Sequence, residues 1–97
     1  METYIMLGNY TGQGIASIKD SPSRIETARK AMEAAGGKLV AWYLTIGRYD
    51  FVLITQAPNV KVAASLLLAI GAQGNIRTET LHALTEAEFK DVVAGLP

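Results

Sequence analysis

The sequence of 97 residues lacks cysteine altogether, which excludes disulfide bonds and thiolate metal sites. It has a single histidine, His82, so one chain cannot build a metal centre from several histidines. It also lacks an excess of positive charge, because nine Lys and Arg residues balance nine Asp and Glu residues. Neither phosphates nor an anionic membrane surface would be attracted. We therefore expect no metal, no cofactor, no nucleic-acid partner and no membrane partner.

A signal-peptide pattern and a long hydrophobic run are also missing. The longest apolar run, VAASLLLAI, is too short to span a bilayer. These absences predict a cytoplasmic protein. The length fits one domain that covers residues 1–97, with a single modest core. Hydrophobic residues nevertheless make up 49% of the chain, so we expect part of the apolar surface to face a partner subunit.

The periodicity of apolar residues predicts four strands, two main helices and a C-terminal helix. The strands are expected at residues 3–10, 38–46, 50–57 and 75–84, and the helices at 20–37, at 60–74 and after 85. The order β-α-β-β-α-β with right-handed crossovers gives an α+β, ferredoxin-like fold. Its four-stranded sheet is antiparallel, both main helices lie on one face, and a C-terminal helix follows.

Capping residues predict where the helices begin and end. The first main helix could begin with Ser21 as its cap and Pro22 at its first position, or with a capping box of Ser23 and Glu26. The last helix should begin with a capping box at residues 85–88. The helix at 60–74 is apolar enough to be well buried.

The face of the sheet that the helices leave open is expected to be apolar as well. Ile5 and Leu7 alternate with Tyr4 and Met6 in the first strand, instead of with polar residues. The second and third strands behave in the same way. We therefore expect this face to pack on the same face of a second copy, giving a homodimer or a larger homo-oligomer.

The segment GRYD interrupts the two central strands. A two-residue turn at 47–48 would pair Thr45 with Asp50, whereas a three-residue turn would pair Ile46 with Asp50 and reverse the faces of the third strand. The two-residue turn is preferred. It places the following residues on the helix-covered face: Val40, Trp42, Leu44, Ile46, Phe51 and Leu53.

Four segments carry a resemblance to a known family: LGNYTGQGI, IKDSPSRIE, GGKLVAWYLTIGRYDFVLI and GAQGNIRTETLHALTEAEF. Together they closely resemble the GYD domain family, whose name-giving Gly, Tyr and Asp correspond to Gly47, Tyr49 and Asp50. The resemblance implies a ferredoxin-like, dimeric α/β barrel and no general biochemical function. The chain is more weakly similar to the ligand-sensing domain of leucine-responsive regulators, which implies a stand-alone sensing module.

Few polar side chains are available for chemistry. Arg77 and Glu79 share one face of their strand, where they could pair with each other, with a partner subunit or with a ligand carboxylate. His82 points to the other face, as a structural ring or as a general acid or base. The candidate ligand-binding residues are Tyr10, Tyr43, Asp50, Arg77, Glu79 and His82. Asp50 has the alternative role of accepting backbone N–H bonds at the hairpin.

The glycine-rich segment GNYTGQGI does not fit a phosphate-binding loop. A P-loop needs Lys-Ser or Lys-Thr after its last glycine, and Ile15-Ala16 stands there. We expect a flexible connection, with the alternative that Asn9, Tyr10 and Thr11 rim a cavity. No cysteine or G-x-S-x-G nucleophile is present either.

Three functions compete on this evidence. The leading hypothesis is a homo-oligomeric module that binds or senses a small molecule in a pocket at the sheet face. The first alternative is a small dimeric-barrel enzyme, of monooxygenase or isomerase type, that uses His82 or Tyr43. The second is a structural or interaction subunit without a ligand.

Overall fold

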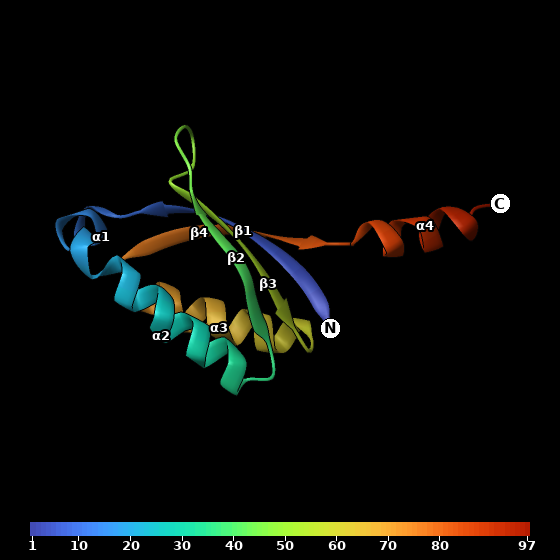
Figure 1. The fold of residues 1–97 in the computed structure, drawn as a ribbon, viewed down its shortest axis with the longest axis horizontal. Coiled ribbons are helices and arrows are strands. Elements are labelled where there is room, and N and C mark those ends of the chain that lie inside the picture. Colours follow the sequence, from blue (N-terminus) through green and yellow to red (C-terminus); the bar gives the residue numbers. More distant parts are fainter.

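The computed structural model describes the whole chain, residues 1–97, as one sheet with its two long helices on one side and a C-terminal helix that extends away (Figure 1). The strands are β1 (Glu2–Tyr10), β2 (Lys38–Leu44), β3 (Phe51–Ala57) and β4 (Ile76–Ala83). The helices are α1 (Gly12–Ala16), the 3-10 helix η1 (Ile18–Asp20), α2 (Ser21–Ala34), α3 (Val60–Ala72) and α4 (Glu86–Ala94). The strand order is β2-β3-β1-β4 and all neighbours are antiparallel, which confirms the ferredoxin-like prediction.

The core lies between the sheet and the two long helices α2 and α3 (Figure 1). Alternate residues of β1 and β3 point toward these helices and are buried, while their neighbours face the open side and are half-buried. The main buried cluster consists of Met6, Met32, Leu39, Phe51 and Leu53. The open face of the sheet is therefore uncovered within one chain.

The register of the central hairpin follows the two-residue-turn prediction. Leu44 lies opposite Phe51, and the Thr45 N–H donates to the Asp50 carbonyl at 2.9 Å. Gly47 adopts a φ of +142°, a conformation that side chains disfavour. The three-residue alternative is thereby excluded.

Three residues predicted for the helix-covered core are exposed instead. The pairing shifts between Leu39 and Ala41, so this bulge turns Leu39 inward and leaves Val40 46% exposed. The end of the hairpin between β2 and β3 extends beyond the helix layer (Figure 1). Leu44 ends β2 and is largely exposed, and Ile46 in the connection is fully exposed. The predicted core is wrong at these positions because neither a bulge nor the reach of a helix layer follows from alternation.

The ends of the helices agree only in part with the prediction. The capping box of Thr85 and Glu88 is present at the start of α4. At α2 neither predicted cap forms, because η1 runs directly into the helix and the Ser21 N–H donates to the Ile18 carbonyl. Glu26 lies 3.2 Å from Arg29 instead of closing a capping box.

Helices α3 and α4 are less buried than expected. Only Ala63 is fully buried on α3, and Leu68 is 75% exposed, so the prediction of a well-buried helix is wrong for the single chain. α4 extends away from the sheet and has no buried residue (Figure 1). No helix of the chain is long and apolar enough to cross a bilayer.

Candidate functional site

A cavity of about 320 Å³ lies between the sheet and helices α2 and α3. Side chains of all four strands contribute to its lining from the sheet, and both helices contribute from the other side. Three of the helical lining residues are alanines, at positions 28, 31 and 69. Because alanine side chains are short, they leave space between the helices and the sheet that larger residues would fill.

Aromatic rings form part of the cavity lining on the sheet. The rings of Trp42 and Phe51 are stacked, with centroids 5.6 Å apart, and Tyr10 meets Phe51 at 5.3 Å in a tilted arrangement. Gly8 makes this possible, because a Cβ atom there would lie 2.1 Å from the Phe51 ring. The Phe51 ring can therefore lie directly on β1.

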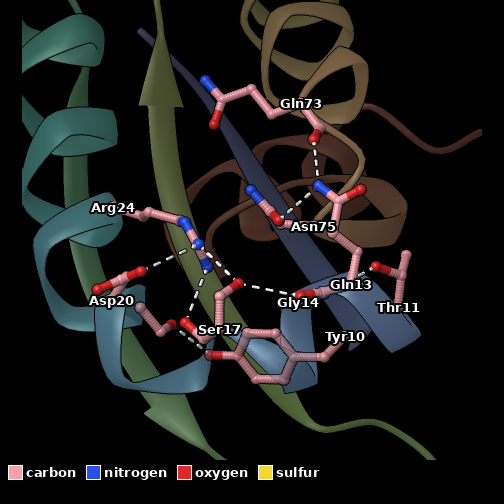
Figure 2. Close-up of polar contacts among 10 residues, drawn as sticks. Tyr10, Thr11, Gln13, Gly14, Ser17, Asp20, Arg24, Gln73 and Asn75 are labelled. Atoms are coloured by element: carbon pink, nitrogen blue, oxygen red, sulfur yellow. Dashed lines mark hydrogen bonds and ion pairs between the residues drawn. The ribbon is translucent and has the colours of Figure 1, made fainter.

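Polar groups gather at one end of the cavity, near α1, η1 and the start of α2 (Figure 2). The Tyr10 and Ser21 hydroxyls are 2.7 Å apart. The Arg24 guanidinium donates to the Ser17 hydroxyl at 2.8 Å and lies 3.7 Å from the Asp20 carboxylate. The cavity thus combines a mostly apolar lining with a small polar end.

The glycine-rich segment next to this end is ordered by contacts with the chain between α3 and β4 (Figure 2). The Thr11 hydroxyl donates to the Gly74 carbonyl at 2.6 Å and accepts from the Gly14 N–H at 3.1 Å. The Gln13 amide donates to the Gln73 carbonyl and to the Asn75 side chain, both at 3.0 Å. The predicted flexible connection is therefore wrong.

Gly14 itself has no room for a side chain. A Cβ atom at this position would lie 2.0 Å from the Asn75 carbonyl oxygen. α1 can pack this closely on the loop before β4 only because residue 14 is glycine.

Asp50 holds Tyr10 in place from the neighbouring strand. Its carboxylate accepts the Tyr10 N–H at 2.9 Å, and its own N–H donates to the Gly8 carbonyl at 2.8 Å. Asp50 is absent from the cavity lining. The carboxylate accepts a backbone N–H, as the alternative role required, but this N–H belongs to Tyr10 of β1 and not to the hairpin.

Arg77 and Glu79 lie on the open face of the sheet, away from the cavity. Glu79 accepts a hydrogen bond from the Tyr49 hydroxyl at 2.6 Å, and this bond is the main reason why the pKa of Tyr49 is raised. Arg77 forms no ion pair within the chain, so of the three pairings that the sequence left open, the one with Glu79 is not formed. Tyr43 is also on this face and is largely exposed.

His82 belongs to a separate aromatic pair. Its ring stacks on that of Tyr4, with centroids 4.9 Å apart. The Tyr4 hydroxyl donates to Glu2 at 2.8 Å, and burial is the main cause of the raised pKa of Tyr4. His82 and Tyr43 lie on opposite faces of the sheet, so they do not form one acid–base pair. No group of three metal-binding side chains is present.

Of the six predicted residues, only Tyr10 lines the cavity. The sequence reasoning missed Trp42, Phe51, Ser21 and Arg24 as site residues. The alanines of the first long helix were a usable signal, because a helix that packs tightly on a sheet would present larger residues there. No signal in the sequence revealed that Arg24 lines the same cavity as Tyr10.

The sequence matches one protein-family model and a relative from another organism. The family model described as "GYD domain" matches residues 4–93. A Thermus thermophilus protein named "glutamine synthetase and cystathionine beta-lyase binding protein" is 32% identical over 90 residues, which cover 92% of this chain and 95% of the relative.

Solved structures show the same fold. The feast or famine regulatory protein from M. tuberculosis, complexed with L-methionine, superposes with a TM-score of 0.67 at 18% identity over 88% of this chain and 51% of that chain. A protein from T. thermophilus superposes with a TM-score of 0.56 at 22% identity, over 88% and 95% of the two chains. The chain thus spans about half the length of the regulator.

Proposed function

Because this chain belongs to the GYD domain family, we propose that it is a homo-oligomeric module that binds a small molecule in the cavity between its sheet and helices α2 and α3. The cavity is the observation that carries this proposal. Its volume of about 320 Å³ and its apolar lining with a few polar groups at one end are typical of ligand sites. The ligand would then lie on the helix-covered face, with Tyr10 as the one predicted residue that contacts it.

The open face of the sheet supports the oligomer. Four apolar side chains on this face are incompletely buried: Ile5, Leu7, Val52 and Ile54. Contact of their apolar surface with water is unfavourable. A second copy that packs sheet against sheet would cover them. We assign Tyr43, Arg77 and Glu79 to this interface, where Arg77 is free to pair across it.

The regulator from M. tuberculosis supports the proposal that the ligand is a small molecule. Its structure was solved in complex with L-methionine, so a protein that contains this fold binds a small molecule. The shared property is the fold, and the ligand of this chain does not follow from it. We expect the module to act in the cytoplasm.

Native mass spectrometry of freshly purified protein, with the same sample denatured for comparison, tests the proposal. We expect an even number of subunits and a reproducible additional mass that denaturation releases. Ala28→Phe should fill the cavity and remove this mass, whereas Ala34→Phe, an exposed site of the same helix outside the lining, should retain it. A monomer, or an additional mass unaffected by Ala28→Phe, would contradict the proposal.

A second function, binding to metabolic enzymes, is favoured by α4. An exposed apolar stripe on this helix is formed by Phe89, Val92 and Val93, and the exposed Leu96 follows the end of the helix. The T. thermophilus relative is named for binding two enzymes. Calorimetry with purified glutamine synthetase and cystathionine β-lyase would test it. Phe89→Asp should abolish binding and Ala87→Asp, off the stripe, should not; absence of binding to either enzyme would exclude this function.

The enzyme alternative has no comparable support. His82 stacks on Tyr4 and Tyr43 is exposed on the other face, so neither contacts the cavity.

A further inference from the structure

The polar end of the cavity contains its only charged lining residue, Arg24. The Arg24 side chain is 30% exposed and lines the cavity together with Tyr10. Its nearest carboxylate belongs to Asp20, whose side chain is 72% exposed. An ion pair with so exposed a partner is weak, because water screens it. The positive charge is therefore only loosely compensated.

The hydrogen-bonding capacity of Arg24 is also incompletely used. A guanidinium has five N–H donors. The structure gives two bonds, both to Ser17, and the one to the Ser17 carbonyl is long at 3.4 Å. At 3.7 Å the Asp20 carboxylate is beyond hydrogen-bond distance. Donors remain for a planar, two-oxygen anion, the group that a guanidinium binds best.

The rest of the cavity determines the size and the aromatic character of the ligand. Trp42, Phe51 and Tyr10 present ring surfaces, and Leu and Ile side chains of α2 and α3 complete the enclosure. An apolar protein cavity of about 150 Å³ accommodates one benzene molecule. The cavity here is roughly twice that size, which suits a flat body of about two fused rings.

We propose that the cavity binds an aromatic monocarboxylate, with the rings against Trp42 and Phe51 and the carboxylate at Arg24. This inference rests on the proposed function and names its ligand class. The carboxylate accepts N–H bonds from the guanidinium and displaces the loosely held Asp20. The Tyr10 and Ser21 hydroxyls border the carboxylate and select against a second apolar group at that end.

Two probes of nearly equal size separate the charge from the rings: indole-3-acetate and the uncharged indole-3-ethanol. Affinities are measured by calorimetry at pH 7 on the full chain, with thermal shift as a second readout. We expect indole-3-acetate to bind about tenfold more tightly, since hydrogen bonds to a charged group are the stronger kind. Arg24→Gln should remove the difference, while Lys30→Gln, the same charge change at an exposed site of α2, should retain it.

A filling variant tests the location. Ala28→Phe should abolish binding of both probes, and Ala69→Leu on α3 serves if Ala28→Phe unfolds. Equal affinities for the two probes, a preference that survives in Arg24→Gln, binding that survives filling, or no binding of either probe would each overturn the inference. The proposed function would still stand if native mass spectrometry found an uncharged or larger molecule that filling releases.

Discussion

Thr80 has the one buried side-chain oxygen of this protein without a hydrogen-bond partner. Thr80 is on β4 and lies opposite Met6 of β1. Because Met6 belongs to the buried cluster and paired residues share a face, the Thr80 hydroxyl faces the core. A buried hydroxyl that lost its water without gaining a partner destabilises the folded state. The residue offers a direct test of how the core is packed.

Thr80→Val should stabilise the protein by about 1 kcal/mol, because valine has nearly the same shape and needs no partner. Urea unfolding followed by circular dichroism measures this change. Thr78→Val, at an exposed site of the same strand, is the control and should change the free energy of unfolding by less than about 0.5 kcal/mol. A decrease in stability for Thr80→Val would mean that the hydroxyl has a partner after all.

Asp50 is the second informative residue, because it binds Tyr10 of the neighbouring strand. Asp50→Ala leaves the Tyr10 N–H unpaired and should cost about 1–3 kcal/mol of unfolding free energy. Asp50→Asn keeps an oxygen acceptor and should recover part of that loss. Equal stability of all three proteins would show that the bond is dispensable.

At the scale of elements, α4 depends on its own sequence more than on its surroundings. The Glu88 carboxylate accepts the Thr85 N–H at 2.9 Å, and the Thr85 hydroxyl accepts the Glu88 N–H at 3.2 Å. No residue of the helix is buried. The cap is thus a large share of what holds this helix together.

The cap makes α4 sensitive to pH. The backbone N–H of Thr85, followed by its side chain, lowers the pKa of Glu88 below its usual value. The capping contribution is therefore present above the pKa of Glu88 in the unfolded helix and lost as the pH falls through the lowered pKa. We expect the Cα chemical shifts of α4 to lose helical character in that window, and Glu88→Gln to remove the transition. An unchanged titration in Glu88→Gln would contradict this assignment.

Local signals explain which elements the sequence could predict. The capping box at Thr85 and the hairpin pairing near Gly47 depend on neighbouring residues, and both are confirmed. The exposure of Val40 depends on a bulge set by the partner strand, and the start of α2 depends on η1 before it. Alternation and capping rules contain neither kind of information.

The candidate site was less predictable because it also depends on contacts between distant segments. Tyr10 was found because it ends a strand beside glycines. Arg24 belongs to a helix that appeared ordinary, and its place in the same cavity lining as Tyr10 depends on how α2 packs on the sheet. A cavity is a property of packing between distant segments, so no single stretch of sequence shows it.

At the scale of the whole molecule, the chain is 53 Å long and only 18 Å thick, since α4 leaves the body and one sheet face is bare (Figure 1). Such a shape leaves much apolar surface in water and favours association. Ile54, on β3 in the middle of the open face, is the position at which a charge should disturb a dimer most.

Ile54→Lys should raise the dissociation constant of the dimer by about 100-fold or more, because two lysines would be buried without partners at a symmetric interface. Sedimentation over a concentration series measures the constant. Leu68→Lys, an apolar-to-lysine change at an exposed site of α3, should leave it unchanged. A dimer that persists in Ile54→Lys would place the interface elsewhere, with α4 as the next surface to test.

The hydrogen bond between Tyr10 and Asp50 connects the cavity on one face of the sheet to residues on the open face. Tyr10 lines the cavity, Asp50 holds its backbone, and the adjacent Tyr49 reaches Glu79 on the open face. The adjacent residues Tyr49 and Asp50 thus contact both the open face and the cavity lining. If a bound molecule changes the dimerisation constant by some factor, thermodynamic linkage requires dimerisation to change the affinity for that molecule by the same factor. Protein concentration would then act as an effector of this domain, and ligand affinity would report how much of the protein the cell contains.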